Sequence, residues 1–150
     1  MKKIFFLLLL ILGSCSLTSD QEQALNNSVT SYVDVRNDAG LLSYVAFTHP
    51  NVVAYYKDLG DSLFLDKFNL NEEHNWMYIQ DGNQKLVEKS SNNIHVKYSF
   101  IASNEFAFDD GAKEIFIYAV SNDNGVNWFF VDEEDYTNND IISEKDRLIK

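Results

Sequence analysis

The side chains that could do chemistry in this 150-residue chain are few and scattered. The single cysteine is Cys15, and the three histidines are His49, His74 and His95. No two histidines have the spacing of a zinc site, so we expect neither a metal nor a cofactor. His49 precedes Pro50 and is expected to start a helix. His95 belongs to an alternating strand pattern and is expected to face solvent.

Two acidic runs, 109–110 and 132–135, carry carboxylates of the kind that bind calcium. Neither has the spacing of an EF-hand loop, so we interpret both as solvated surface charge. The net charge of −11 argues against contacts with a phosphate backbone, and we expect no nucleic-acid partner. An acidic surface suits a basic protein partner, which makes an inhibitor or immunity-type protein one candidate function.

Eight ring side chains could line an apolar pocket and offer it a few hydroxyl or imidazole groups. Side chains of this kind usually belong to a packed core, and that alternative stays open. A small apolar ligand is therefore one expected partner. The pocket candidates are Tyr44, His49, Tyr55, Tyr56, Trp76, Tyr98, Tyr118 and Trp128.

The first fifteen residues have the pattern of an export signal. Two lysines precede an apolar run, 4–12, that is shorter than the about 20 residues needed to cross a bilayer. The sequence Leu-Gly-Ser-Cys at 12–15 resembles the lipobox of bacterial lipoproteins, in which the cysteine is acylated and the chain is cut before it. The resemblance implies a signal peptide over 1–14 and membrane lipid bound through Cys15. An ordinary secretory signal with an incidental cysteine is the alternative.

The residues after the cysteine indicate where such a protein would be sorted. Ser16 stands where lipoproteins retained in the inner membrane of two-membrane bacteria carry aspartate. The resemblance therefore implies an outer-membrane lipoprotein of the cell envelope, on the periplasmic face or on the cell surface. Residues 15–22 are expected to form the lipidated cysteine and a polar tether.

The first half of the folded part is predicted to be helical. Apolar side chains recur at helical spacing over 25–36, and Gly40 follows them as a typical helix end. A further helix is predicted between Pro50 and Gly60, with a short one before it and a turn or two after it. The sequence therefore predicts three or four short helices over 19–70.

The second half is predicted to form short strands joined by turns. Residues 76–79 are predicted to be a strand, 85–88 its return strand, and the intervening Asp-Gly pair a turn. Residues 94–102 alternate cleanly, as in a half-buried antiparallel strand. Helices followed by a meander predict an α+β domain with N-terminal helices packed on an antiparallel sheet.

The strongest hairpin signal is the Asn124-Gly125 pair between two apolar runs. A two-residue type I′ turn needs positive φ at both positions, which these residues tolerate. Such a turn places Val120 opposite Phe129 and leaves both faces of the hairpin apolar, so each must be covered. We expect helices on one face. On the other we expect the C-terminal tail or a second copy of the chain, with a homodimer through the sheet face preferred.

Two stretches resemble the nuclear-transport-factor-2-like superfamily, in which a curved sheet wraps around helices like a cone. They are 41–53, LLSYVAFTHPNVV, and 124–131, NGVNWFFV. The resemblance implies a cone-like domain over 23–135. The remaining residues, 136–150, have the character of a polar tail, in which four apolar side chains suggest a short helix. Members of the superfamily include isomerases, dehydratases, cyclases and non-enzymes, so no catalytic residue is carried over.

We therefore expect a lipid-anchored envelope protein whose domain binds a small ligand or a partner, and not an enzyme. A pocket enzyme of the isomerase, dehydratase or cyclase kind is the first alternative, and the acidic inhibitor or immunity-type protein is the second. An open pocket with a buried carboxylate or histidine would favour the enzyme, and a filled interior would favour binding through the surface.

Overall fold

The computed structural model of the protein describes residues 16–37, 41–68, 77–79, 82–104 and 113–150. Within these residues, four helices precede an antiparallel sheet of five strands, and a fifth short helix follows it. This order confirms the predicted α+β class, with N-terminal helices packed on the sheet. The cone-like shape implied by the family resemblance is not confirmed.

The N-terminal helices lie close to the places that the sequence predicts. They are α1 (Ser19–Asn37), α2 (Leu41–Phe47), α3 (Pro50–Leu59) and α4 (Asp61–Phe68). Proline fits the first position of α3 because no intrahelical partner is lost there. Gly60, with a φ of 114°, ends α3, so the prediction of three or four short pieces is confirmed.

The sheet is organised around β3, its longest strand in the described residues. β3 pairs with β4 on one side and with both β1 and β2 on the other, and β5 extends the sheet beyond β4. All of these pairs are antiparallel. The strands are β1 (Met77–Ile79), β2 (Asn83–Lys89), β3 (Ile94–Asn104), β4 (Lys113–Ser121) and β5 (Phe129–Asp132).

The predicted hairpin between 76–79 and 85–88 is wrong. β1 and β2 lie end to end along the same side of β3, so the chain continues in one direction through them. Gly82, between them, is required for space: a Cβ there would lie 2.6 Å from the ring of Phe100. The reversal comes later, where β2 turns back into β3 through residues 90–93.

The hairpin of β4 and β5 has the predicted register, with Val120 opposite Phe129. Asn124 and Gly125 both have positive φ, 60° and 86°, as the predicted turn requires. The register prediction is therefore confirmed, including the assignment of side chains to the two faces.

The loop of this hairpin is wider than two residues because side chains capture its backbone donors. The Oγ atom of Ser121 accepts a hydrogen bond from the Gly125 N–H at 2.8 Å. The Oδ1 atom of Asp123 accepts one from the Asn127 N–H at 2.9 Å. These contacts replace ladder bonds near the turn, so β5 begins only at Phe129.

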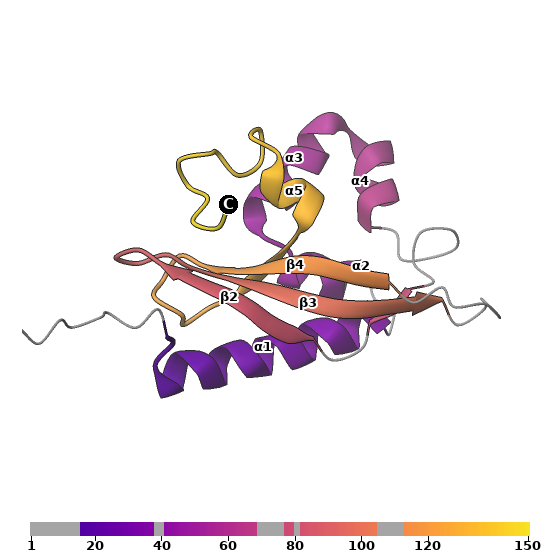
Figure 1. Ribbon diagram of the computed structural model, residues 1–150. Coiled ribbons are helices and arrows are strands. Elements are labelled where there is room, and N and C mark those ends of the chain that lie inside the picture. Colours follow the sequence, from indigo (N-terminus) through magenta and orange to yellow (C-terminus); the bar gives the residue numbers. More distant parts are fainter. Residues whose placement is uncertain (1–15, 38–40, 69–76, 80–81, 105–112) are drawn as a thin grey trace, which may run out of the picture.

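Each face of the sheet is covered by a different part of the chain (Figure 1). On one face lies α1, where Tyr32 stacks on Phe130 with ring centroids 4.2 Å apart. On the other lies α5 (Glu133–Thr137), where Tyr136 stacks on Tyr118 at 3.8 Å. The buried core includes Leu25, Tyr32, Val96, Tyr98, Phe100, Ile117, Ala119, Trp128 and Phe130, so the interior is filled.

The C-terminal segment, residues 138–150, forms turns where a short helix was suggested. It packs against the domain through buried Ile141, Ile142 and Ile149. The guanidinium of Arg147 gathers the segment by donating to four oxygen atoms. The acceptors are the carbonyl oxygens of Tyr136, Thr137 and Ile142 and Oδ1 of Asn139, at 3.3, 2.7, 3.3 and 2.7 Å. The segment thus lies in the core of its own chain, and the homodimer stays a prediction.

The start of α1 is tied to one end of the sheet, which we call the turn end. It comprises the β2–β3 turn, 90–93, and the β4–β5 loop. The ammonium of Lys89 donates to the carbonyl oxygen of Ser16. The side-chain amide of Gln21 donates to the carbonyl oxygen of Asn124 at 2.8 Å. Residues 19–22, which the sequence assigned to the tether, belong to the first turns of α1.

Candidate functional site

Two histidines from different elements line one cavity near the turn end. The cavity, which we call the histidine cavity, has a volume of about 140 Å³. His49 reaches it from the start of α3, and His95 from β3. The C-terminal segment supplies one wall through Ile142 and Asp146. The remaining lining residues are Asn51, Asn93, Val120 and Asn122.

His49 is the N-cap of α3, as predicted, and is 5% exposed. Its Nδ1 atom accepts a hydrogen bond from the Asn51 N–H at 3.2 Å. The backbone N–H of His49 donates to the carbonyl oxygen of Phe130 at 3.0 Å, which fixes the helix start to β5. The imidazole is therefore positioned by the first turn of the helix and by the sheet together.

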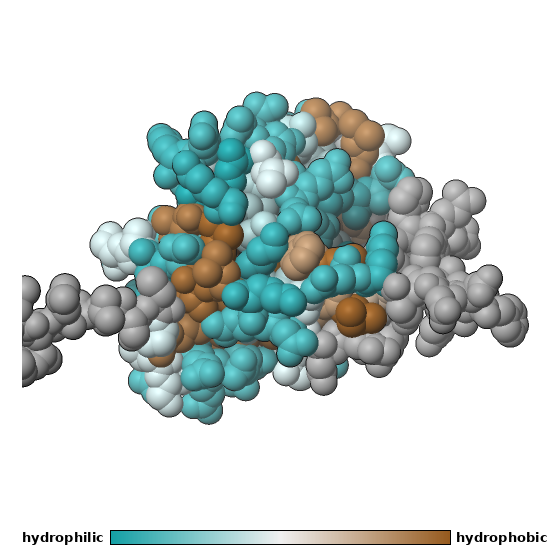
Figure 2. Space-filling view, viewed as in Figure 1, coloured by the Kyte–Doolittle hydropathy of each residue, from teal (hydrophilic) through white to brown (hydrophobic). Residues whose placement is uncertain are grey.

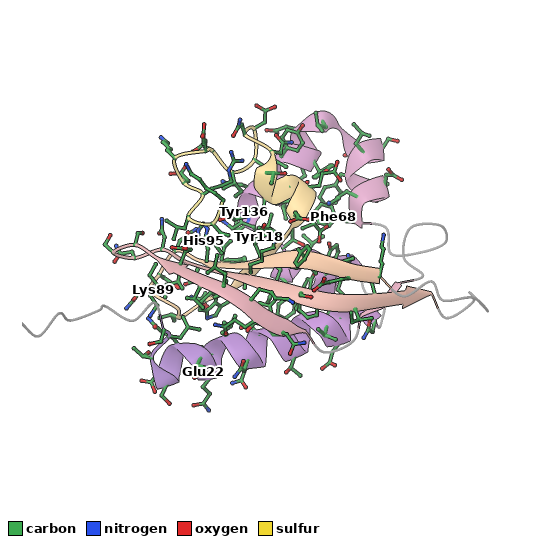
Figure 3. The ribbon with its side chains drawn as sticks, viewed as in Figure 1. Glu22, Phe68, Lys89, His95, Tyr118 and Tyr136 are labelled. Atoms are coloured by element: carbon green, nitrogen blue, oxygen red, sulfur yellow. The ribbon has the colours of Figure 1, made fainter. Side chains whose placement is uncertain are left out.

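His95 is buried, and the prediction that it faces solvent is wrong. It is 2% exposed because α5 and the C-terminal segment cover its face of the sheet. Its Nδ1 atom lies 2.6 Å from the hydroxyl of Tyr136, and Figure 3 shows the two side chains approaching from β3 and α5. The Tyr136 hydroxyl also accepts the Ile149 N–H at 3.3 Å. The hydroxyl keeps its hydrogen and a second acceptor site, so it pairs with Nδ1 either as donor or as acceptor.

The contact with Asn51 fixes where the imidazole of His49 carries its hydrogen. A neutral imidazole has one ring N–H, and Nδ1 of His49 accepts a hydrogen bond from the Asn51 N–H. The hydrogen of His49 is therefore on Nε2, whereas the Tyr136 hydroxyl can pair with Nδ1 of His95 in either tautomer. For His49, Nε2 lies 3.5 Å from the side-chain amide of Asn122, whose oxygen is the suitable partner.

Nε2 of His95 opens into the cavity. None of the described residues contacts it by a hydrogen bond. In the described part of the chain, the only side-chain nitrogen or oxygen that is fully buried without a hydrogen bond is Oδ2 of Asp135. Nε2 of His95 also lacks a hydrogen bond, so it cannot be fully buried and must have free space beside it. The cavity is thus lined by Nε2 of His95 and by the Nε2–H of His49 with its neighbour Asn122.

Both imidazoles are uncharged at neutral pH. Burial lowers the pKa of His49 below its usual value. Burial, helped by nearby His49, lowers the pKa of His95 to about 4. The one charged lining residue is Asp146, which accepts a hydrogen bond from the hydroxyl of Ser143. The histidine cavity is therefore polar, rich in donors and free of cationic side chains among the described residues.

A second cavity, which we call the charged cavity, has a volume of about 320 Å³. Inside it, the ammonium of Lys67 lies 3.1 Å from Oδ2 of Asp132 and 2.6 Å from Oδ2 of Asp135. The Tyr56 hydroxyl donates to Oδ1 of Asp135 at 3.0 Å. The residues that line the cavity are Arg36, Tyr44, Tyr56, Leu63, Asp66, Lys67, Asp132 and Glu134.

The ion pairs set the charge state of this cavity. Burial alone would lower the pKa of Lys67, but Asp132 and Asp135 outweigh it and raise that pKa well above its usual value. Burial alone would raise the pKa of Asp132, but Lys67 and Arg36 outweigh it and lower that pKa. Lys67 and Asp132 therefore stay charged over the physiological pH range.

The predicted pocket residues do not converge on one site. Tyr44 and Tyr56 line the charged cavity, and His49 lines the histidine cavity. Tyr55 is half-buried and packs edge-on against Tyr56. Tyr98, Tyr118 and Trp128 are buried in the core, whereas Trp76 and His74 lie outside the described residues.

Sequence reasoning missed the polar residues that complete both cavities. Asn51 and Asn122 lie on a helix start and a loop, where asparagine is common for local reasons, so no signal distinguishes them. The burial of His95 could have been predicted. His95 lies opposite Val120 in the sheet, on the face that also carries Tyr118. The hairpin register already required this face to be covered.

The surface in the view of Figure 2 is largely hydrophilic, with one hydrophobic patch at the left near the turn end of the sheet and another over the corner between α3 and α4. Leu59 and Leu63 are about half exposed there. A shallow apolar groove of about 360 Å³ lies between α2, α3 and Phe129.

Comparisons with known proteins give this chain no relative. No protein-family model, no curated protein and no solved structure matches it. Among the described residues, no group of three or more histidine, cysteine or acidic side chains could hold a metal ion. No helix in the same residues has the length and hydrophobicity to cross a membrane.

Proposed function

We propose that this protein is a lipoprotein, anchored through acylated Cys15 to the cell envelope, whose domain binds a small uncharged polar ligand in the histidine cavity. The N-terminal signal and lipobox pattern support the anchor. The pair of buried imidazoles in one cavity supports the binding role. An outer-membrane location is part of the proposal and rests on Ser16.

The size of the cavity limits the ligand. An apolar cavity of about 150 Å³ holds one benzene molecule, so the histidine cavity, at about 140 Å³, suits a group of about six non-hydrogen atoms. The imidazole donor of His49 and three asparagine amides favour a ligand with oxygen acceptors, such as an amide or hydroxyl group. The carboxylate of Asp146 at the wall disfavours an anion.

The hydrogen bond from Asn51 to the imidazole of His49 favours binding over catalysis. A general base needs an unprotonated nitrogen that faces the substrate. In His49 the unprotonated Nδ1 is used by Asn51, and the nitrogen left for the cavity carries a hydrogen. In this cavity the isomerase, dehydratase or cyclase alternative therefore has only the buried imidazole of His95 as a candidate base. Several of the rings that the sequence suggested for an apolar pocket, Tyr98, Tyr118 and Trp128, are instead packed in the core.

The anchor is tested by metabolic labelling with a fatty acid in a two-membrane bacterium. The wild type and a Ser16→Ala control should take up label and fractionate with membranes. Cys15→Ala should do neither, because it lacks the only thiol of the chain. Label on Cys15→Ala would refute the anchor.

The cavity is tested with two small probes of equal size, acetamide and acetate. Acetamide should shift the Nε2 resonances of His49 and His95 saturably, and acetate should bind at least tenfold more weakly. His95→Phe should abolish the response, whereas Ser31→Ala, on the exposed face of α1, should keep it. Tighter binding of acetate would mean an anion site, and no response to either probe would refute the binding role.

A further inference from the structure

The charged cavity lies where six elements meet, and four of them, α1, α4, β5 and α5, supply its charged side chains. Arg36 comes from the last turn of α1, and Asp66 and Lys67 come from α4. Asp132 ends β5, and Glu134 belongs to the first turn of α5. None of these side chains lines the histidine cavity. A ligand here would therefore be held by residues that the proposed function does not use.

The charge of Lys67 is already matched by two carboxylates of the chain. Its ammonium contacts the carboxylates of Asp132 and Asp135, at 3.1 and 2.6 Å. Asp135 is 2% exposed, and the Tyr56 hydroxyl holds its other oxygen. The group of Lys67 and two aspartates therefore carries one net negative charge and forms a fixed part of the wall.

Arg36 is different, because its guanidinium is attracted by Asp132 but has no hydrogen-bond partner among the described residues. It lies over the ring of Tyr44, 4.6 Å from the ring centroid. Within the described residues it makes no hydrogen bond, and no carboxylate lies at ion-pair distance from it. Stacking on a tyrosine fixes the plane of a guanidinium and leaves its N–H groups at the edge free for a carboxylate. Arg36 lines the cavity, so these donors are within reach of a ligand.

The rest of the cavity is acidic. Asp66 and Glu134 are exposed and add two carboxylates to the one net negative charge around Lys67. A simple anion would be repelled by them, and a simple cation would leave Arg36 without a partner. Leu63 and the rings of Tyr44 and Tyr56 supply apolar surface between the charged groups.

We propose that the charged cavity binds a zwitterionic ligand of the amino-acid class. Arg36 takes the carboxylate in a bidentate pair, Asp66 and Glu134 attract the ammonium group, and Leu63 contacts an apolar side chain. The volume of about 320 Å³ lies within the range of about 300–1,000 Å³ typical of small-molecule sites.

The test compares leucine with two derivatives that each lack one charge. Titration calorimetry on residues 16–150 should detect leucine. N-acetylleucine, which lacks the ammonium group, and leucinamide, which lacks the carboxylate, should each bind at least tenfold more weakly. Equal binding of leucinamide and leucine would refute the pairing of a carboxylate with Arg36. No binding of leucine or phenylalanine would refute the proposal.

Matched variants separate binding from folding. Glu134→Gln should weaken leucine at least threefold, and the exposed control Glu144→Gln should not. Arg36→Gln should remove binding, whereas Lys57→Gln, on α3, should keep it. Arg36 also packs on Tyr44, so Arg36→Gln is used only if its melting temperature equals that of the wild type. If the melting temperature changes, Arg36→Lys is used in its place. Leucine affinity that survives both Arg36 variants would refute the site. His95→Phe should leave the leucine affinity unchanged, which separates this test from that of the histidine cavity.

Discussion

The buried imidazole of His95 should make the stability of the domain depend on pH. Burial, with a smaller effect of His49, lowers the pKa of His95 from 6.5 to about 4. The unfolded chain therefore takes up a proton near pH 6.5 that the folded domain takes up only near pH 4. The stabilisation is fully present above pH 6.5 and is lost as the pH falls toward 4.

The size of the effect follows from this interval. One pH unit corresponds to about 1.4 kcal/mol when the unfolded state binds one more proton than the folded state. Over the whole interval the domain loses about 3 kcal/mol, and by pH 4.5 about 2–3 kcal/mol. Domains of ordinary stability have a free energy of unfolding of about 5–15 kcal/mol. The loss is therefore large enough to measure by denaturation.

The assay is urea unfolding of the wild type and of His95→Asn between pH 7.5 and 4.5. Asparagine keeps an acceptor near the position of Nδ1 but cannot bind the proton. Carboxylates with lowered pKa, such as Asp123 and Asp132, titrate in both proteins and cancel in the difference. The stability advantage of the wild type should shrink by about 2–3 kcal/mol on acidification. Parallel curves would refute the buried, neutral state of His95.

Three further changes test other contacts. Gly125→Ala should lower the free energy of unfolding by about 1–2 kcal/mol, since φ is 86° there and the new Cβ would lie 2.7 Å from a side-chain atom of α1; a melting curve like that of the exposed control Val126→Ala would contradict this. Arg147→Gln should speed amide hydrogen exchange in the C-terminal segment, because four hydrogen bonds are lost, whereas Lys145→Gln should not; equal rates would show that the segment holds without its clamp. Truncation after Asn139 should give an unfolded monomer by light scattering and circular dichroism, whereas a folded dimer would mean that a second copy can cover the sheet.

The elements that could be predicted are those fixed by local chemistry. Asn124-Gly125 tolerates positive φ at two successive positions, and this alone sets the register of the hairpin and the sides of its residues. Proline and glycine likewise mark both ends of α3. Each of these signals acts within a few residues, so a sequence without relatives still carries it.

The features that escaped prediction depend on contacts between distant parts of the chain. Alternation assigns His95 to a strand face, but only the tail, some forty residues later, decides that this face is dry. The Asp-Gly pair at 81–82 looks like a turn, although Gly82 is required by the ring of Phe100. Arg36 and Glu134 are far apart in the sequence and share a cavity only because the end of α1 lies near the start of α5.

The pinned start of α1 would restrict where the domain can go. Only residues 16–18 separate Cys15 from the helix, and fully extended they span about 10 Å. The contact between Lys89 and Ser16 shortens the free part of this linker further. A domain of this size has a radius of gyration of about 14 Å. With lipid on Cys15, this linker would be shorter than the radius of the domain, so the turn end would rest against the headgroups. The domain would then meet a ligand or partner close to the bilayer surface.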